Sequence, residues 1–178
     1  MMISTHTITS IALAGAVVSI AYNFGYTIDK ELLQFIIPSI LLGTAFPDID
    51  EPESWIGRRT RGISDLIKII FGHRGITHTL IFILVFTLIL IAINIFYGEK
   101  HFFLSIFGFA FGMLGHIIGD AHTKSGIMLF YPFSKKRYYV LPKFLRFKTG
   151  GIKEQIFALF YSAIIMVEIT YIFQKGTI

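Results

Sequence analysis

The sequence predicts an all-α membrane protein, a polytopic bundle of about five transmembrane helices that forms a single domain over residues 1–178. Hydrophobic residues make up 54% of the chain and the mean hydropathy is +0.69, well above the balance of soluble domains. Phenylalanine alone contributes 19 residues. A soluble domain of this size could not bury so much apolar surface, whereas a bilayer accepts it because lipid tails are equally apolar.

The expected helices follow from the length of the apolar segments, since about 20 apolar residues cross the hydrocarbon core of a bilayer. Four segments approach that length, and a fifth is shorter and contains Pro38. The expected helices cover residues 8–24, 32–46, 76–96, 102–119 and 156–173, with long loops over residues 47–75 and 120–155. No Lys or Arg precedes the first segment, so we interpret it as a helix of the bundle and not as a cleaved signal peptide.

The basic residues predict the orientation of the chain. Thirteen of the 16 Lys and Arg residues lie in the two long loops. The positive-inside rule therefore places both loops and the N-terminus in the cytoplasm and the C-terminus outside, in a prokaryotic cytoplasmic membrane. Basic and aromatic residues alternate over 129–148; on a soluble protein this would suit nucleic acid, but beside a membrane we expect contact with anionic lipid and no nucleic-acid partner.

The chain has no cysteine. Its absence excludes disulfides, cysteine-ligated zinc and thiol catalysis. A metal ion would therefore be bound through histidine nitrogens and carboxylate oxygens, a donor set that suits zinc and also admits manganese.

Four histidines and three aspartates lie at one set of helix ends. They are His6, Asp48, Asp50, His73, His78, His116 and Asp120. In the predicted topology all of these ends are cytoplasmic, so the charge distribution and the His/Asp positions agree. Gathering so many polar groups at one depth of a membrane is costly without a shared role. A metal ion would satisfy them together.

The spacing of these residues along the chain limits the roles that each can have at a metal site. His116 and Asp120 are four apart, so they lie on one helical face, although packing partners can also satisfy such a pair. Asp48 and Asp50 follow Pro47 in a predicted loop. Both can point inward, one can ligate while the other orients a histidine, or they can be solvated acids after a helix.

The segment between the second and third helices contains three further candidates. His73 and His78 are five apart, a poor spacing for one helical face, so we expect them to straddle the helix start with Gly75 between them. Either or both can ligate. Arg74 can bind an anionic substrate group. We rank His122 as a weak ligand candidate because it faces away from Asp120 on a helix.

Several pieces of the chain resemble the YdjM-type family of membrane-bound, metal-dependent hydrolases. They are Thr5-His6, Pro47 to Asp50, His73 to Thr79, and His116 to Asp120 followed by Thr123 and Gly126. The family's arrangement is similar to that of zinc-dependent phospholipase C. This resemblance implies one ion held by Asp48 or Asp50, by His78 or His73, and by the His116–Asp120 pair. It also implies a neighbouring ion held by His6, with Asp120 bridging.

These observations together predict a metal-dependent hydrolase that cleaves a phosphoester in a phospholipid or lipid-linked headgroup at the cytoplasmic leaflet. Asp48, Asp50 and Arg74 are the expected catalytic residues. The expected cofactor is one to three divalent metal ions, with zinc favoured over manganese. Membrane lipids are the expected surroundings and substrate; the oligomeric state stays open. The alternatives are a non-catalytic metal-binding or lipid-binding module and a metal-ion carrier, and a site at one membrane face, away from the midplane, disfavours a carrier.

Overall fold

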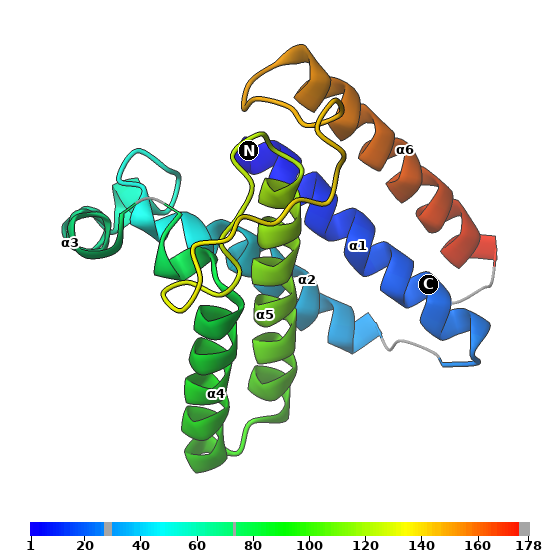
Figure 1. Ribbon diagram of the computed structural model, residues 1–178. Coiled ribbons are helices and arrows are strands. Elements are labelled where there is room, and N and C mark those ends of the chain that lie inside the picture. The colour runs from blue at the N-terminus through cyan, green and yellow to red at the C-terminus, as the bar shows by residue number, and fades with distance from the viewer. Residues whose placement is uncertain (27–29, 73, 175–178) are drawn as a thin grey trace.

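The computed structural model describes residues 1–26, 30–72 and 74–174, and these ranges contain helices and no β-strand. Six α-helices follow one another along the chain (Figure 1). They are α1 (Ile3–Asn23), α2 (Lys30–Ala45), α3 (Arg61–Phe71), α4 (Leu80–Tyr97), α5 (Lys100–Ala121) and α6 (Ile152–Gln174). Three 3-10 turns, η1 (Phe46–Asp50), η2 (Gly57–Arg59) and η3 (Ile76–His78), lie between them. The all-α prediction is confirmed.

Four of the described helices are long and apolar enough to cross a membrane: α1, α4, α5 and α6. The fifth expected span, α2, has 16 residues and therefore extends about 24 Å at 1.5 Å per residue. The hydrocarbon core of a bilayer is about 30 Å thick. By length, the described part of the chain thus has four spanning helices where the sequence suggested about five. α1 also begins at Ile3, earlier than expected, so that His6 lies inside the helix.

α5 lies at the centre of the bundle and contacts α1, α2 and α4. Its glycines permit this close packing. A Cβ atom on Gly112 would lie 2.7 Å from the backbone nitrogen of Thr44 in α2, and one on Gly115 would lie 2.8 Å from Cβ of Ser10 in α1. Small residues let helix backbones approach closely in lipid. The stripe of glycines in α5 therefore packs helices together, as its spacing indicated.

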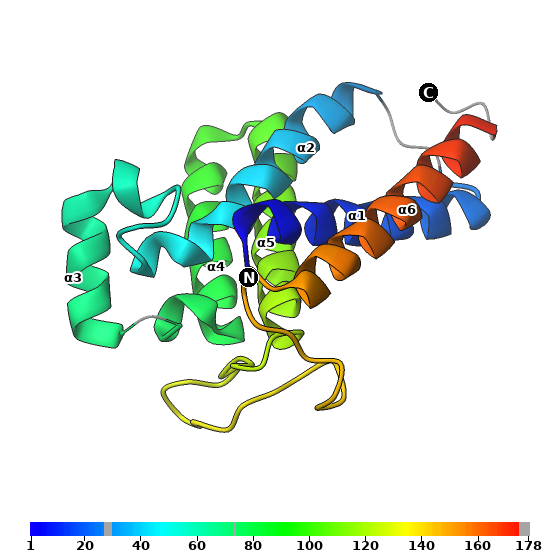
Figure 2. The ribbon, with the colours of Figure 1, turned by 90° about the horizontal axis from the view of Figure 1, so that it is seen from above.

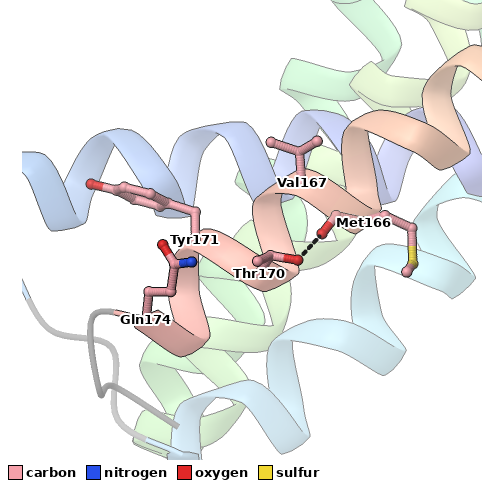
Figure 3. Close-up of a pocket in the computed structure, with 5 residues that line it drawn as sticks. All are labelled: Met166, Val167, Thr170, Tyr171 and Gln174. Carbon is pink, nitrogen blue, oxygen red and sulfur yellow. Dashed lines mark hydrogen bonds between the residues drawn. The ribbon is translucent and has the colours of Figure 1, made fainter.

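α4 and α6 lie at the outside of the bundle (Figures 1 and 2). α4 is capped by the Thr79 hydroxyl, which accepts a hydrogen bond from the Phe82 backbone. α6 packs along α1. Near the end of α6, Met166, Val167, Thr170, Tyr171 and Gln174 line a shallow pocket of about 370 Å³ (Figure 3). This pocket has no ionisable group that could bind a metal, so the chemistry predicted above lies elsewhere.

The two long connections differ from each other. The first, expected as a loop over residues 47–75, contains α3, because Ile63, Leu66, Ile67 and Ile70 recur at helical spacing. The second, after α5, has no described helix and folds back over the ends of α4 and α5. Backbone hydrogen bonds hold it there, from Leu80 to Leu129 and from Val140 to Ala121. Both connections lie at the same end of the α4–α5 pair (Figure 1).

Candidate metal centre

Histidine and aspartate side chains from four elements meet at the end of α5 that carries its C-terminus. The residues are His6 from α1, Asp48 and Asp50 from η1, His78 from η3, and His116 and Asp120 from α5. All are buried except Asp48, whose side chain is 20% exposed. The structure thus brings together six of the seven predicted metal-binding residues. The seventh, His73, lies outside the described residues.

His116 faces two carboxylates with a nitrogen that needs a partner. Its Nδ1 lies 2.7 Å from the carbonyl oxygen of Thr44, and because a carbonyl can only accept, Nδ1 carries the hydrogen. In its neutral form the ring then presents the lone pair of Nε2 to Asp48 Oδ1 at 3.5 Å and to Asp120 Oδ2 at 3.8 Å. This buried Nε2 has no hydrogen-bond partner in the described part of the chain. A metal ion between these atoms would be a partner for the nitrogen and for both oxygens.

His78 forms a group of three donor residues with Asp48 and His116, whose ligand atoms lie within 4.8 Å of one another. Its Nε2 lies 3.6 Å from Asp48 Oδ1 and 3.7 Å from Asp120 Oδ2. Ligand atoms around a tetrahedral zinc ion, with bonds of about 2.0–2.2 Å, lie roughly 3.3–3.6 Å apart. The four nitrogen–oxygen separations, 3.5–3.8 Å, are wider by a few tenths of an ångström. Asp48 Oδ1 can therefore share an ion with the two histidine nitrogens, and Asp120 Oδ2 lies 3.7–3.8 Å from the same two nitrogens.

Asp50 lies on the other side of the His78 ring. Its Oδ2 is 3.2 Å from His78 Nδ1 and accepts hydrogen bonds from the Thr77 hydroxyl at 2.7 Å and the Arg74 backbone at 2.9 Å. The two aspartates of η1 therefore flank one imidazole, Asp48 beside Nε2 and Asp50 beside Nδ1. Carboxylates in the position of Asp50 commonly orient a metal-binding histidine and raise its basicity.

His6 forms a second donor group with His116 and Asp120. The His6 and His116 rings stack with their centroids 3.7 Å apart, and His6 Nε2 lies 3.4 Å from Asp120 Oδ1. Both ring nitrogens of His6 are buried without a hydrogen-bond partner among the described residues. The ring fits because residue 119 is glycine, where a Cβ atom would lie 2.8 Å from His6 Nδ1.

Arg74 lies at the open side of the cluster. Its Nη2 donates to Asp120 Oδ1 at 2.8 Å, an oxygen that also lies 2.9 Å from the Met1 amino group. Its Nη1 contacts the hydroxyls of Thr123 and Ser125. The Arg74 side chain is 15% exposed, so the guanidinium reaches from the buried aspartate to the surface.

Two donor residues, Asp48 and His78, lie outside the spanning helices, and their neighbours shift their pKa values. Burial alone would lower the pKa of His78, but the carboxylates of Asp48 and Asp50 outweigh burial and raise that pKa to about 9. Burial alone would raise the pKa of the Asp48 carboxyl, but the neighbouring rings of His116 and His78 lower it below its ordinary value. Without an ion the cluster therefore holds a proton on His78 at neutral pH, and an ion binding there would displace it.

The remaining histidine of α5's end stands apart from the cluster. His122 donates from Nδ1 to the Ile118 carbonyl at 2.6 Å, and its ring centroid lies 4.8 Å from that of Phe157. The sequence argument had ranked His122 as a weak candidate because it would face away from Asp120 on a helix. Sequence reasoning did not single out the Thr77 hydroxyl or the Thr44 carbonyl as partners of the site. Thr77 lies inside the quoted His73–Thr79 segment, whereas a backbone carbonyl leaves no trace in a sequence.

The chain matches the family described as YdjM inner membrane protein over residues 1–176. It belongs to the YdjM family. The match extends through the last third of the chain, where no motif had been recognised. This membership and the four spanning helices confirm that the protein is an integral membrane protein, as its composition predicted.

Curated relatives carry the same family name. The chain is 36% identical over 100 residues to the inner membrane protein YdjM of Escherichia coli (strain K12) and to that of Shigella flexneri, an alignment that covers 54% of this chain. It spans about half the length of these relatives, 49%. The chain is also 33% identical over 152 residues to the uncharacterized protein YvsG of Bacillus subtilis (strain 168), covering 85% of this chain and 84% of YvsG. No solved structure matches it significantly, so the likeness to phospholipase C stays an expectation.

Proposed function

We propose that this YdjM-family protein is a metal-dependent hydrolase that cleaves a phosphoester in an anionic lipid or lipid-linked headgroup. The observation that carries the proposal is the convergence of His78, His116, Asp48 and Asp120. The Nε2 atom of His116 is buried against two carboxylates and lacks a hydrogen-bond partner among the described residues. His and Asp donors of this kind suit zinc and also admit manganese. His6 and Asp120 would hold a second ion beside the first.

Each residue has a distinct task in this proposal. Asp50 and the Thr44 carbonyl fix the ring tautomers of His78 and His116, so that both Nε2 atoms face the ion. Asp48, the donor with a partly exposed side chain, would also accept a proton from an attacking water. Arg74 would bind the phosphoryl oxygens through its planar guanidinium. When bound, the ion would supply Lewis-acid polarisation of a phosphoryl oxygen and ease deprotonation of the water.

A basic pocket beside the centre supports an anionic substrate. Lys124, Tyr139, Lys143 and Arg146 line this pocket, which has a volume of about 330 Å³. Within the described residues none of its three cations is paired with a carboxylate, and the Arg146 guanidinium lies 3.4 Å from the centroid of the Tyr139 ring. Lys124 precedes Ser125, whose hydroxyl contacts Arg74. A substrate phosphate at the centre would thus have further positive charge close by.

The orientation is part of the same proposal. The connections between α2 and α4 and between α5 and α6 carry 12 of the 16 basic residues, and both lie at the end of the bundle where the centre is. The positive-inside rule would put this end in the cytoplasm. The substrate would then be a headgroup of the cytoplasmic leaflet.

The test uses the full chain reconstituted in vesicles of bacterial polar lipids and loaded with zinc or manganese. Lipid mass spectrometry would follow the appearance of cleaved headgroups or diacylglycerol. We expect metal-dependent cleavage that Arg74→Gln reduces by at least tenfold while the bound metal stays unchanged. His122→Gln is the matched control, because His122 lies outside the cluster and should retain full activity.

A protein that binds metal stoichiometrically but cleaves no lipid would contradict the hydrolase proposal. It would favour the non-catalytic metal-binding module, in which the ion holds four helix ends together. Metal transport into vesicles, measured in the same preparation with a metal-sensitive dye inside, would instead favour the carrier.

A further inference from the structure

The helix α3 is amphipathic, and its two faces are oriented in the opposite way to those of a soluble protein. Six of its residues, Ile63, Leu66, Ile67, Ile69, Ile70 and Phe71, form a wide apolar arc on a helical projection. In a soluble domain such an arc faces the core. In α3 it points away from the protein: Ile69 is 82% exposed, and Ile63, Leu66 and Ile70 are each close to 60% exposed.

The polar face of α3 is the face that holds the helix to the protein. Ser64 is completely buried. Lys68 pairs with Glu51 at 2.7 Å and Arg61 pairs with Glu53 at 3.3 Å, both in the segment that follows η1. α3 also packs against η1 itself. The polar contacts therefore fix the helix with its apolar arc outward, where it needs an apolar covering.

The direction of α3 identifies that covering. In Figure 1, α4 and α5 are seen from the side and α3 is seen end-on, whereas Figure 2 shows α3 from the side. α3 thus runs across the direction of the two spanning helices, and it lies level with their site-bearing ends (Figure 1). A helix that lies across the spans at their ends is parallel to the membrane surface, at the depth where headgroups meet acyl chains.

Residues next to α3 suit the same depth. Trp55 is 42% exposed, and the Arg59 guanidinium lies 4.0 Å from the centroid of its ring. Tryptophan is enriched at membrane interfaces, and arginine there meets lipid phosphates. Arg58, Arg59 and Arg61 precede the apolar arc. The cations and the apolar surface together match a lipid surface.

We propose that α3 is an in-plane membrane anchor, whose apolar arc lies among the lipid acyl chains of the leaflet on the side of the His/Asp cluster. Its place in the chain gives the anchor a role. η1, with Asp48 and Asp50, precedes α3 by ten residues that include η2, and Arg74 and His78 follow α3 closely. Anchoring α3 holds both donor-bearing segments at the level of the headgroups. This inference concerns binding to lipid and does not depend on hydrolysis.

The test uses single cysteines, which the cysteine-free chain makes unambiguous. Ile69→Cys carries an environment-sensitive fluorophore in the full chain reconstituted in phosphatidylglycerol–phosphatidylcholine vesicles. Ile63→Cys is a second position on the same arc. Leu88→Cys, exposed in the middle of α4, and Lys135→Cys, in the connection after α5, mark the deep and the aqueous limits. Lipids with a spin label near the top or deep in the acyl chain quench the fluorophore according to depth.

We expect the labels at Ile69 and Ile63 to be quenched at least twofold more by shallow than by deep spin labels. Leu88 should show the reverse preference, and Lys135 should be quenched by iodide in water. Iodide quenching at Ile69 and Ile63 would overturn the proposal. So would protection from both iodide and lipid quenchers together with a dimeric mass in detergent, because a second copy of the chain would then cover the arc.

Discussion

Two neighbouring helices of the bundle, α4 and α5, are both apolar and long enough to cross a membrane, yet they differ in what surrounds them. In α4 only Ile83 and Asn94 are buried, and most of its large side chains are exposed. In α5 ten residues are buried, and among them are four glycines and two of the predicted metal ligands. α4 is built to face lipid, whereas α5 is built to be surrounded by protein.

The comparison shows how a membrane helix can carry buried polar chemistry. Four glycines bring the backbones of α1 and α2 against α5. The same close approach places the Thr44 carbonyl at His116 and the His6 ring on the His116 ring. Packing and site geometry in α5 thus depend on the same residues. α4 contributes to the site through the turn before it, where His78 lies.

The largest effect is expected from adding a side chain to the packed face of α5. Gly112→Leu would force α2 away, because even a Cβ atom would lie 2.7 Å from the Thr44 nitrogen. Overpacking of a core typically costs about 1–3 kcal/mol, and we expect the free energy of unfolding to fall by more than this. Thermal unfolding in detergent measures it. Ala92→Leu, on the exposed face of α4, is the matched control and should change stability by less than about 0.5 kcal/mol. Equal losses of stability in the two variants would contradict the difference between a lipid-facing α4 and a protein-packed α5.

A smaller effect is expected where α6 meets the buried end of α1. Glu154 is completely buried, and its two oxygens accept hydrogen bonds from the Met2 and Gly150 backbones at 2.7 and 2.6 Å. Glu154→Ala would leave these donors unsatisfied, at a cost of about 1–3 kcal/mol. The readout is again thermal unfolding. Glu168→Ala, in the same helix, removes an acid that forms no hydrogen bond with the described residues and should be neutral or stabilising. A larger loss for Glu168 than for Glu154 would contradict this assignment.

The smallest effect is expected at the basic pocket beside the centre. Lys143→Gln removes one of three cations there. Because exposed charge pairs contribute about 0.2–1 kcal/mol, we expect KM for an anionic lipid substrate to rise about two- to fivefold with kcat unchanged. Lys135→Gln, in the same connection but outside the pocket, is the control. A rise in KM that is equal in both variants would mean that general surface charge, and not the pocket, attracts the substrate.

Much of the fold follows from the sequence because only long apolar segments can cross the hydrocarbon core of a bilayer. The apolar segments predicted the helices, and the basic residues predicted that the long connections would lie at one end. Because His116 and Asp120 close one helix while His78 opens another, an antiparallel pair had to bring them together. α3 was missed, since its apolar residues were taken for part of a charged loop although Ile63, Leu66, Ile67 and Ile70 recur at helical spacing.

Other features of the site depend on contacts that a sequence does not record. The different positions of Asp48 and Asp50 around His78 arise from the 3-10 turn that carries them, whereas the sequence allowed several arrangements. Thr44 acts through its backbone carbonyl, a group that every residue has. Glu154 reaches Met2 across nearly the whole length of the chain. α2, in contrast, lies close to the bounds that its short apolar segment predicted, and it is not among the helices long enough to cross a membrane.

The most direct test of the central claim is the metal content of the purified protein after loading and removal of free ions, measured by inductively coupled plasma mass spectrometry. We predict at least one zinc or manganese ion per chain in the wild type, a loss of most of it in Asp120→Ala and His116→Asn, and full retention in His122→Asn. The two histidines lie six residues apart, His116 in the last turns of α5 and His122 directly after its end. A wild type without metal, or equal retention in all three variants, would contradict a metal centre at this end of α5.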